Sequence, residues 1–111
     1  MNILILGDVM GSSGRKAINN KLKEIINVNK IDFTIINGEN AADDGRGITS
    51  QIANEFFSIG VDVITSGNHI WDKQETVDYI NQETRLLRPA NLAEGSPGKG
   101  YDIYFTKDKK F

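Results

Sequence analysis

The chain has 111 residues, no cysteine and a formal net charge of −2, and hydrophobic and charged residues make up 39% and 25% of it. These values fit one globular domain without disulfides or thiolate metal ligands, and they give no reason to expect duplex nucleic acid or an anionic membrane as a partner. The apolar run 2–7 is too short for a signal peptide or a membrane span, so we expect a cytoplasmic protein.

Three strand–helix units follow one another along the chain. We expect strands at 2–7, 32–37 and 61–65, and the continuous apolar run of the first is typical of a central parallel strand. Helices are predicted to begin at residues 12–14, at 49 or 50 and at 73, the second ended by Gly60 and the third capped by Asp72 with Glu75. This βαβαβα order predicts an α/β fold with a mostly parallel sheet and right-handed crossovers.

The remainder of the chain predicts less regular structure. Residues 86–91 are expected to form a short extended segment, because the residue before Pro89 is disfavoured in a helix. The alternation at 101–105 predicts a strand exposed on one side, followed by a hairpin turn at 107–110 and a new strand beginning at Phe111. We therefore expect residues 1–111 to be a single partial domain, a fragment of a longer fold.

Polar side chains follow each of the three predicted strands: Asp8 after the first, Glu39 and Asn40 after the second, and Asn68 and His69 after the third. The carboxyl ends of parallel strands share one edge of a sheet, and neighbouring strands lie about 4.8 Å apart. Taken singly, each residue has an ordinary alternative role as a cap, a turn residue or a packed histidine. Taken together, they predict a metal site, because carboxylate and carboxamide oxygens bind hard cations and an imidazole favours Fe, Mn, Zn or Ni.

The ordered set Gly7-Asp8, Gly38-Glu39-Asn40 and Gly67-Asn68-His69 resembles the motifs of the calcineurin-like metallophosphoesterases. Within that superfamily it is most similar to the YmdB-like group of bacterial 2′,3′-cyclic-nucleotide phosphodiesterases. Glu39 stands where most of the superfamily has aspartate, and no histidine stands two residues after Asp8. The resemblance implies that the chain is the N-terminal half of an α/β/β/α sandwich.

The resemblance also implies a role for each site residue. Asp8 and Asn40 would bind a first metal ion, Asn68 a second, and Glu39 both, while His69 would donate a proton to the leaving oxygen. The implied cofactors are two divalent or trivalent ions, Fe or Mn first and Mg or Zn as alternatives. In such a binuclear centre a hydroxide attacks a small phosphodiester, here a 2′,3′-cyclic nucleotide.

The sequence departs from the family at one point, because the family completes its metal shell with three further histidines and this chain has one histidine. We therefore expect the 111-residue chain alone to bind metal weakly and to have little or no phosphodiesterase activity. A single sheet of a sandwich would also leave an apolar face uncovered, so we expect either a homo-oligomer or dependence on the missing half.

Two other hypotheses stay open. Gly7, Gly11 and Gly14 could form a dinucleotide-binding glycine loop, which would make the chain a Rossmann-like nucleotide-binding domain that needs no metal. Their spacing departs from Gly-x-Gly-x-x-Gly, and Asp8 places a negative charge where a pyrophosphate would dock. The other hypothesis is a non-catalytic interaction fragment.

Overall fold

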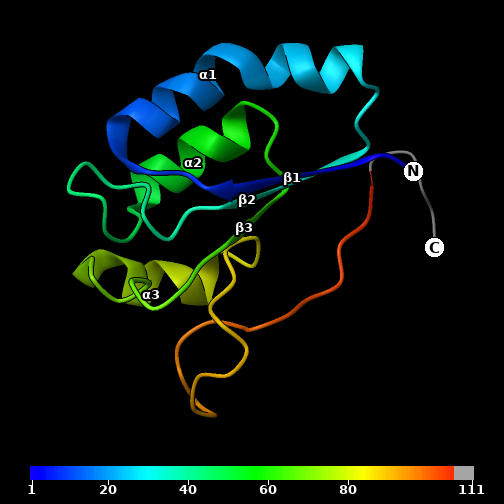
Figure 1. Cartoon of the computed structure of the whole chain (residues 1–111). Coiled ribbons are helices and arrows are strands. Elements are labelled where there is room, and N and C mark those ends of the chain that lie inside the picture. The colour runs from blue at the N-terminus through cyan, green and yellow to red at the C-terminus, as the bar shows by residue number, and fades with distance from the viewer. Residues whose placement is uncertain (107–111) are drawn as a thin grey trace.

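The structure is a computed structural model, and it describes residues 1–106. Strands and helices alternate as β1 (Ile3–Asp8), α1 (Gly11–Val28), β2 (Phe33–Asn37), α2 (Ser50–Ser58), β3 (Val63–Thr65) and α3 (Gln74–Gln82). Figure 1 shows the three strands side by side between α1 and α3. The predicted α/β fold and its βαβαβα order are confirmed. Within the described residues, no helix combines the length and the hydropathy that a membrane span needs.

The strands pair in parallel in the order β1-β2-β3, with Ile5 opposite Ile35 and Ile35 opposite Val63. The extended segment predicted after α3 contributes one further bridge, because Leu86 pairs in parallel with Ile64. Among the described residues β1 is therefore an edge strand, and its predicted central position is wrong. Burial on both faces does not explain its apolar run. Leu4 packs against the core, while Ile5, on the opposite face, is 70% exposed.

The hydrophobic core joins the sheet to all three helices. Ile36 of β2 and Ile64 of β3 are fully buried in one cluster with Leu22 of α1 and Phe56 of α2. Burying side chains of this size stabilises a fold by roughly 1.5–3 kcal/mol each. The packing continues to the end of β2, where a Cβ atom at Gly38 would lie 2.9 Å from the Ile64 side chain. The start of the next loop is therefore fixed by the core.

The helix ends follow the sequence signals at α2 but not at α3. The Thr49 side chain caps α2 by accepting a hydrogen bond from the Ile52 amide, and Gly60 follows the helix with a φ of 113°, as predicted. The predicted cap at Asp72 is wrong, because α3 begins two residues later. Glu75 serves α2 instead, since its Oε1 accepts hydrogen bonds from the amide and the hydroxyl of Ser50, at 2.8 and 3.1 Å.

The second face of the sheet is covered only in part. The strand predicted at 101–105 does not form, because this run pairs with no strand among the described residues. It is held instead by Tyr104, whose ring lies 6.2 Å from that of Phe33 and whose hydroxyl donates a 2.5 Å hydrogen bond to the Thr84 carbonyl. In Figure 1 this red segment ends close to the N-terminus. The predicted turn at 107–110 and the strand at Phe111 lie outside the described residues.

Apolar side chains of β1 and of the 101–105 run are left exposed: Ile3, Ile5, Tyr101, Ile103 and Phe105. Their exposed fractions range from 51% to 82%. An exposed apolar surface of this kind is consistent with the expected uncovered face. Self-association of the chain stays a prediction.

Burial raises the pKa of the Tyr104 phenol to about 12, and the carboxylates of Asp102 and Glu83 add to the effect. The folded state therefore keeps the proton that the unfolded chain releases near pH 10, so this contribution to stability is complete below pH 10 and is lost as the pH rises through 12. We expect an alkaline titration of tyrosine absorbance to contain a component near pH 12 that Tyr104→Phe removes. A loss of amplitude near pH 10 instead of near pH 12 would contradict this docking of Tyr104.

Candidate metal centre

The site lies where the three strands end, and the backbone holds these ends together. The Val9 amide donates to the Asn37 carbonyl at 3.1 Å, which joins the end of β1 to the end of β2. The Gly38 amide donates to the Thr65 carbonyl at 2.9 Å, which joins β2 to β3. The residues that follow each strand therefore start from fixed positions along one edge, as the parallel topology predicts.

Asn40 connects the first and third strand ends through its side chain. Its Nδ2 donates a 2.9 Å hydrogen bond to Oδ1 of Asp8, and its Oδ1 lies 2.6 Å from Nδ1 of His69. Asn40 is only 9% exposed, although Asp8 is exposed and His69 is half-buried. Three of the five predicted site residues are therefore joined in one hydrogen-bonded chain.

This chain of bonds determines which nitrogen of His69 carries its proton. The Asp8 carboxylate is an acceptor, so it requires the amide nitrogen of Asn40 to face it. The amide oxygen of Asn40 then faces the imidazole and accepts from Nδ1–H of His69. Nε2 is left for other partners. In this arrangement Asn40 acts as a hydrogen-bonding bridge, and the second lone pair of its oxygen is left for a cation.

Glu39 reaches the third strand end by direct contact. A Cβ atom built on Gly67 would overlap Oε2 and Cδ of Glu39, so the carboxyl group packs on the glycine backbone. Oε2 is buried and has no hydrogen-bond partner among the described residues. A buried carboxylate oxygen without a partner is costly, and it suits a position next to a cation.

The structure does not connect Asn68 to the other site residues. Its side chain is exposed and makes no hydrogen bond within residues 1–106. The neighbouring turn is ordered, because the Ile70 amide donates to the Gly67 carbonyl at 3.1 Å and the Asp72 amide donates to the His69 carbonyl at 3.0 Å. The position of Asn68 is thus fixed by the backbone of this turn and not by contacts of its side chain.

The loop that carries Glu39 and Asn40 is closed at its base by Gly47. The Gly47 amide donates to the Glu39 carbonyl at 2.5 Å, and the Gly47 carbonyl accepts from the Ala42 amide at 2.9 Å. The φ of Gly47 is 75°, and a Cβ atom there would lie 3.1 Å from the His69 carbonyl oxygen. The glycine therefore allows the closed loop to approach the third strand end.

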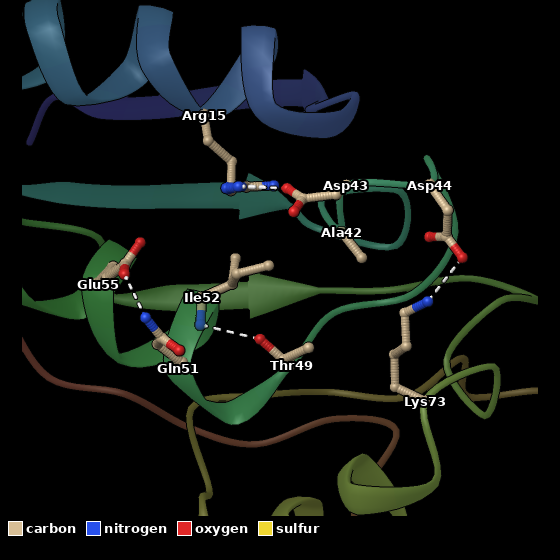
Figure 2. A pocket seen from close by; sticks show the side chains of 9 residues that line it. All are labelled: Arg15, Ala42, Asp43, Asp44, Thr49, Gln51, Ile52, Glu55 and Lys73. Carbon is tan, nitrogen blue, oxygen red and sulfur yellow. Dashed lines mark hydrogen bonds and ion pairs between the residues drawn. The ribbon is translucent and has the colours of Figure 1, made fainter.

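Two cationic side chains contact the tip of this loop. Figure 2 shows Arg15 reaching Asp43 at one side of a cleft of about 490 Å³ and Lys73 reaching Asp44 at the other. The two ion pairs measure 2.6 and 2.7 Å. The Lys73 ammonium and the Arg46 amide lower the pKa of Asp44 by hydrogen bonding to its carboxylate. These contacts join residues 28 and 29 positions apart, so sequence spacing provided no signal for them.

The donor atoms present fit part of a metal site. Within residues 1–106, no three side chains of the His, Cys, Asp or Glu type are close enough together to hold a metal ion. The available donors are the carboxylates of Asp8 and Glu39 and the carboxamides of Asn40 and Asn68, which suit hard cations. The unpartnered Oε2 of Glu39 is the observation that favours a cation at this edge.

Comparison with known proteins gives one family match. A family model described as YmdB-like protein matches residues 4–111, which include every predicted site residue. A protein of Bacillus subtilis (strain 168) named 2′,3′-cyclic-nucleotide 2′-phosphodiesterase is 49% identical over 100 residues, a match that covers 90% of this chain and 38% of the relative.

Two solved structures share the fold. The chain aligns with a hypothetical protein from Thermus thermophilus at a TM-score of 0.87 and 34% identity, over 96% of this chain and 41% of that one. It aligns with a novel phosphatase from Mycoplasma pneumoniae at a TM-score of 0.81 and 29% identity, over 92% of this chain and 38% of that one. The chain thus spans about two-fifths of the length of these relatives.

The contact between Glu39 and Gly67 makes Gly67→Ala a direct test of the site geometry. The new methyl group would overlap the carboxyl group of Glu39, so we expect the free energy of unfolding in urea to fall by about 1–3 kcal/mol. Gly7→Ala is the matched control, because a Cβ atom at Gly7 meets nothing within 4 Å. Equal stability of the two variants would show that Glu39 does not pack on Gly67.

His69 is the only histidine in the chain, so its tautomer can be observed without overlap. We expect the neutral imidazole to carry its proton on Nδ1, because Asn40 offers an acceptor there. A two-bond ¹⁵N–¹H correlation spectrum should show this tautomer and should show it reduced in Asn40→Ala. Asn68→Ala is the control and should leave the spectrum unchanged. The same tautomer populations in Asn40→Ala would contradict the hydrogen-bonded chain.

Proposed function

This chain belongs to the YmdB-like protein family, and we propose that it contributes the oxygen-ligand part of a metal-dependent phosphodiester hydrolase. The observation that carries the proposal is the unpartnered carboxylate oxygen of Glu39, which is buried against Gly67 at the strand edge that also carries the hydrogen bonds from Asp8 to His69. A cation at this edge would compensate the buried negative charge. A nucleotide-binding glycine loop offers no explanation for that charge.

We propose that Asp8, Glu39, Asn40 and Asn68 would hold the metal ions, with Glu39 shared between two of them. Iron or manganese is the expected metal, and magnesium or zinc is the alternative. When bound, such ions would polarise a phosphoryl oxygen and lower the pKa of a water molecule.

His69 would handle the proton that the leaving oxygen needs. Asn40 occupies Nδ1 and so orients the ring, which leaves Nε2 as the nitrogen that can hold a proton and donate it to an alkoxide. The half-buried position of His69 keeps the ring fixed while leaving it open to a small molecule. The role of Asn40 is therefore to orient the acid as well as to approach the metal.

The substrate class proposed is a small phosphodiester, and a 2′,3′-cyclic nucleotide in particular. Support comes from the Bacillus relative, whose name gives that class of substrate. The 111-residue chain has one histidine and four oxygen-ligand residues for this site, so we propose that it alone binds metal weakly and turns over little substrate. That residues 1–111 are one partial domain stays a prediction.

Mn²⁺ is expected to raise the melting temperature of the chain, because an ion that binds the folded state stabilises it by mass action. At about ten times the dissociation constant the gain is about 1.4 kcal/mol, which corresponds to a rise of about 6 °C for a domain of this size. Differential scanning fluorimetry should show the rise in the wild type and its loss in Asp8→Asn and in Glu39→Gln.

NAD is the matched negative ligand for this titration and should leave the melting temperature unchanged. If NAD raises the melting temperature and Mn²⁺ does not, the metal-site proposal is wrong and the Rossmann-like nucleotide-binding hypothesis is favoured. Hydrolysis of a 2′,3′-cyclic nucleotide well above background by the wild-type chain, retained in Glu39→Gln, would likewise oppose the proposed site.

A further inference from the structure

We propose that Arg15 is a positioning residue for the Asp8–Asn40–His69 chain, and that it acts through the carbonyl of Ala41 rather than through its ion pair with Asp43. The inference rests on the proposed function, because the positioned side chains matter for a metal-dependent hydrolase. The hydrogen-bonded chain itself can be observed without metal, so the two proposals can fail separately.

Arg15 belongs to the second turn of α1, and its side chain is 18% exposed. One arm of the guanidinium, Nη1, donates to the Ala41 carbonyl at 2.5 Å. The other arm, Nη2, donates to Oδ1 of Asp43 at 2.6 Å. Figure 2 shows this side chain descending from α1 to the tip of the loop. The Arg15 guanidinium therefore contacts the loop twice, once at a backbone carbonyl and once at a side-chain carboxylate.

The Ala41 contact lies next to the residue that organises the site. Ala41 is fully buried and directly follows Asn40, whose own carbonyl accepts a 2.9 Å hydrogen bond from the Gly11 amide. Two successive carbonyls of the loop are thus held from the first two turns of α1. Holding both fixes the peptide plane from which the carboxamide of Asn40 extends towards Asp8 and His69.

The ion pair between Arg15 and Asp43 is expected to contribute less than the hydrogen bond between Arg15 and the Ala41 carbonyl. Asp43 is 82% exposed, and ion pairs with so much solvent around one partner are screened and contribute little. The pair of Lys73 with Asp44 is similar, since Asp44 is 58% exposed. Removing the donor from the carbonyl of a buried residue is more serious, because it leaves a desolvated acceptor unsatisfied. The hydrogen bond from Nη1 of Arg15 to Ala41 is therefore expected to stabilise the loop more than the ion pair from Nη2 to Asp43.

The experiment compares Arg15→Met, which keeps the apolar stem and removes both arms, with Asp43→Asn, which removes only the ion pair. Without metal, hydrogen exchange of the Gly11 and Gly47 amides reports the loop, because these amides bond to Asn40 and Glu39. We expect their protection to fall about tenfold in Arg15→Met and by less than about threefold in Asp43→Asn. The Nδ1–H signal of His69 should weaken only in Arg15→Met.

The Ile64 amide, which donates to the Arg85 carbonyl and not to the loop, is the internal reference. A loss of protection at Ile64 equal to that at Gly11 and Gly47 would mean general destabilisation and would overturn the proposal. Equal effects of Arg15→Met and Asp43→Asn would overturn it as well, because the ion pair would then be what holds the loop.

A Mn²⁺ titration by calorimetry then separates this inference from the proposed function. We expect Arg15→Met to weaken Mn²⁺ binding by about 10- to 100-fold, the range found for residues that orient metal ligands, and Asp43→Asn to leave it within about threefold. If the wild type takes up no Mn²⁺, the proposed function fails, and the exchange data still decide whether Arg15 positions the loop.

Discussion

The side chain of Asn40 is the constraint on which the site depends. Its amide joins the end of β1 to the turn after β3, and it reaches both from the loop that follows β2. Because an amide offers a donor on one side and an acceptor on the other, it can satisfy a carboxylate and an imidazole at once. Neither a carboxylate nor a hydrocarbon of the same shape could do both. The backbone contacts from α1 and from Gly47 serve to keep this amide in place.

Unlike the Asn40 amide, which has a partner on each side, the Glu39 carboxylate has one buried oxygen that is expected to reduce the stability of the fold. A buried oxygen without a partner costs roughly 1–3 kcal/mol, and the fold accepts this cost at the edge where a ligand is expected. The apolar core behind this edge is closely packed, with Ile36, Ile64 and Phe56 buried in one cluster. The unfavourable group therefore lies at the edge where we propose that the metal ions bind.

The sequence pattern predicted those features of the fold that depend on residues close together in the chain. The strand–helix order, the stop at Gly60 and the position of the site residues at strand ends all follow from periodicity and turn chemistry. Long-range partners could not be predicted in this way. Glu75 caps a helix that begins 25 residues earlier, and the run at 101–105 alternates like a strand but finds no strand to pair with among the described residues. The orientation of the Asn40 amide depends on Asp8, 32 residues away.

The consecutive order of the strands has a consequence for how the chain folds. Each new strand pairs with the one made just before it, so every step closes a loop of similar length and similar entropic cost. Asn40 meets Asp8 across 32 residues and His69 across 29, which are short separations for a site built from three segments. Both separations are long compared with the contacts inside a helix, so we expect these pairings to form more slowly than the helices between them. The residues up to His69 therefore contain the contacts needed to assemble this corner as the chain leaves the ribosome.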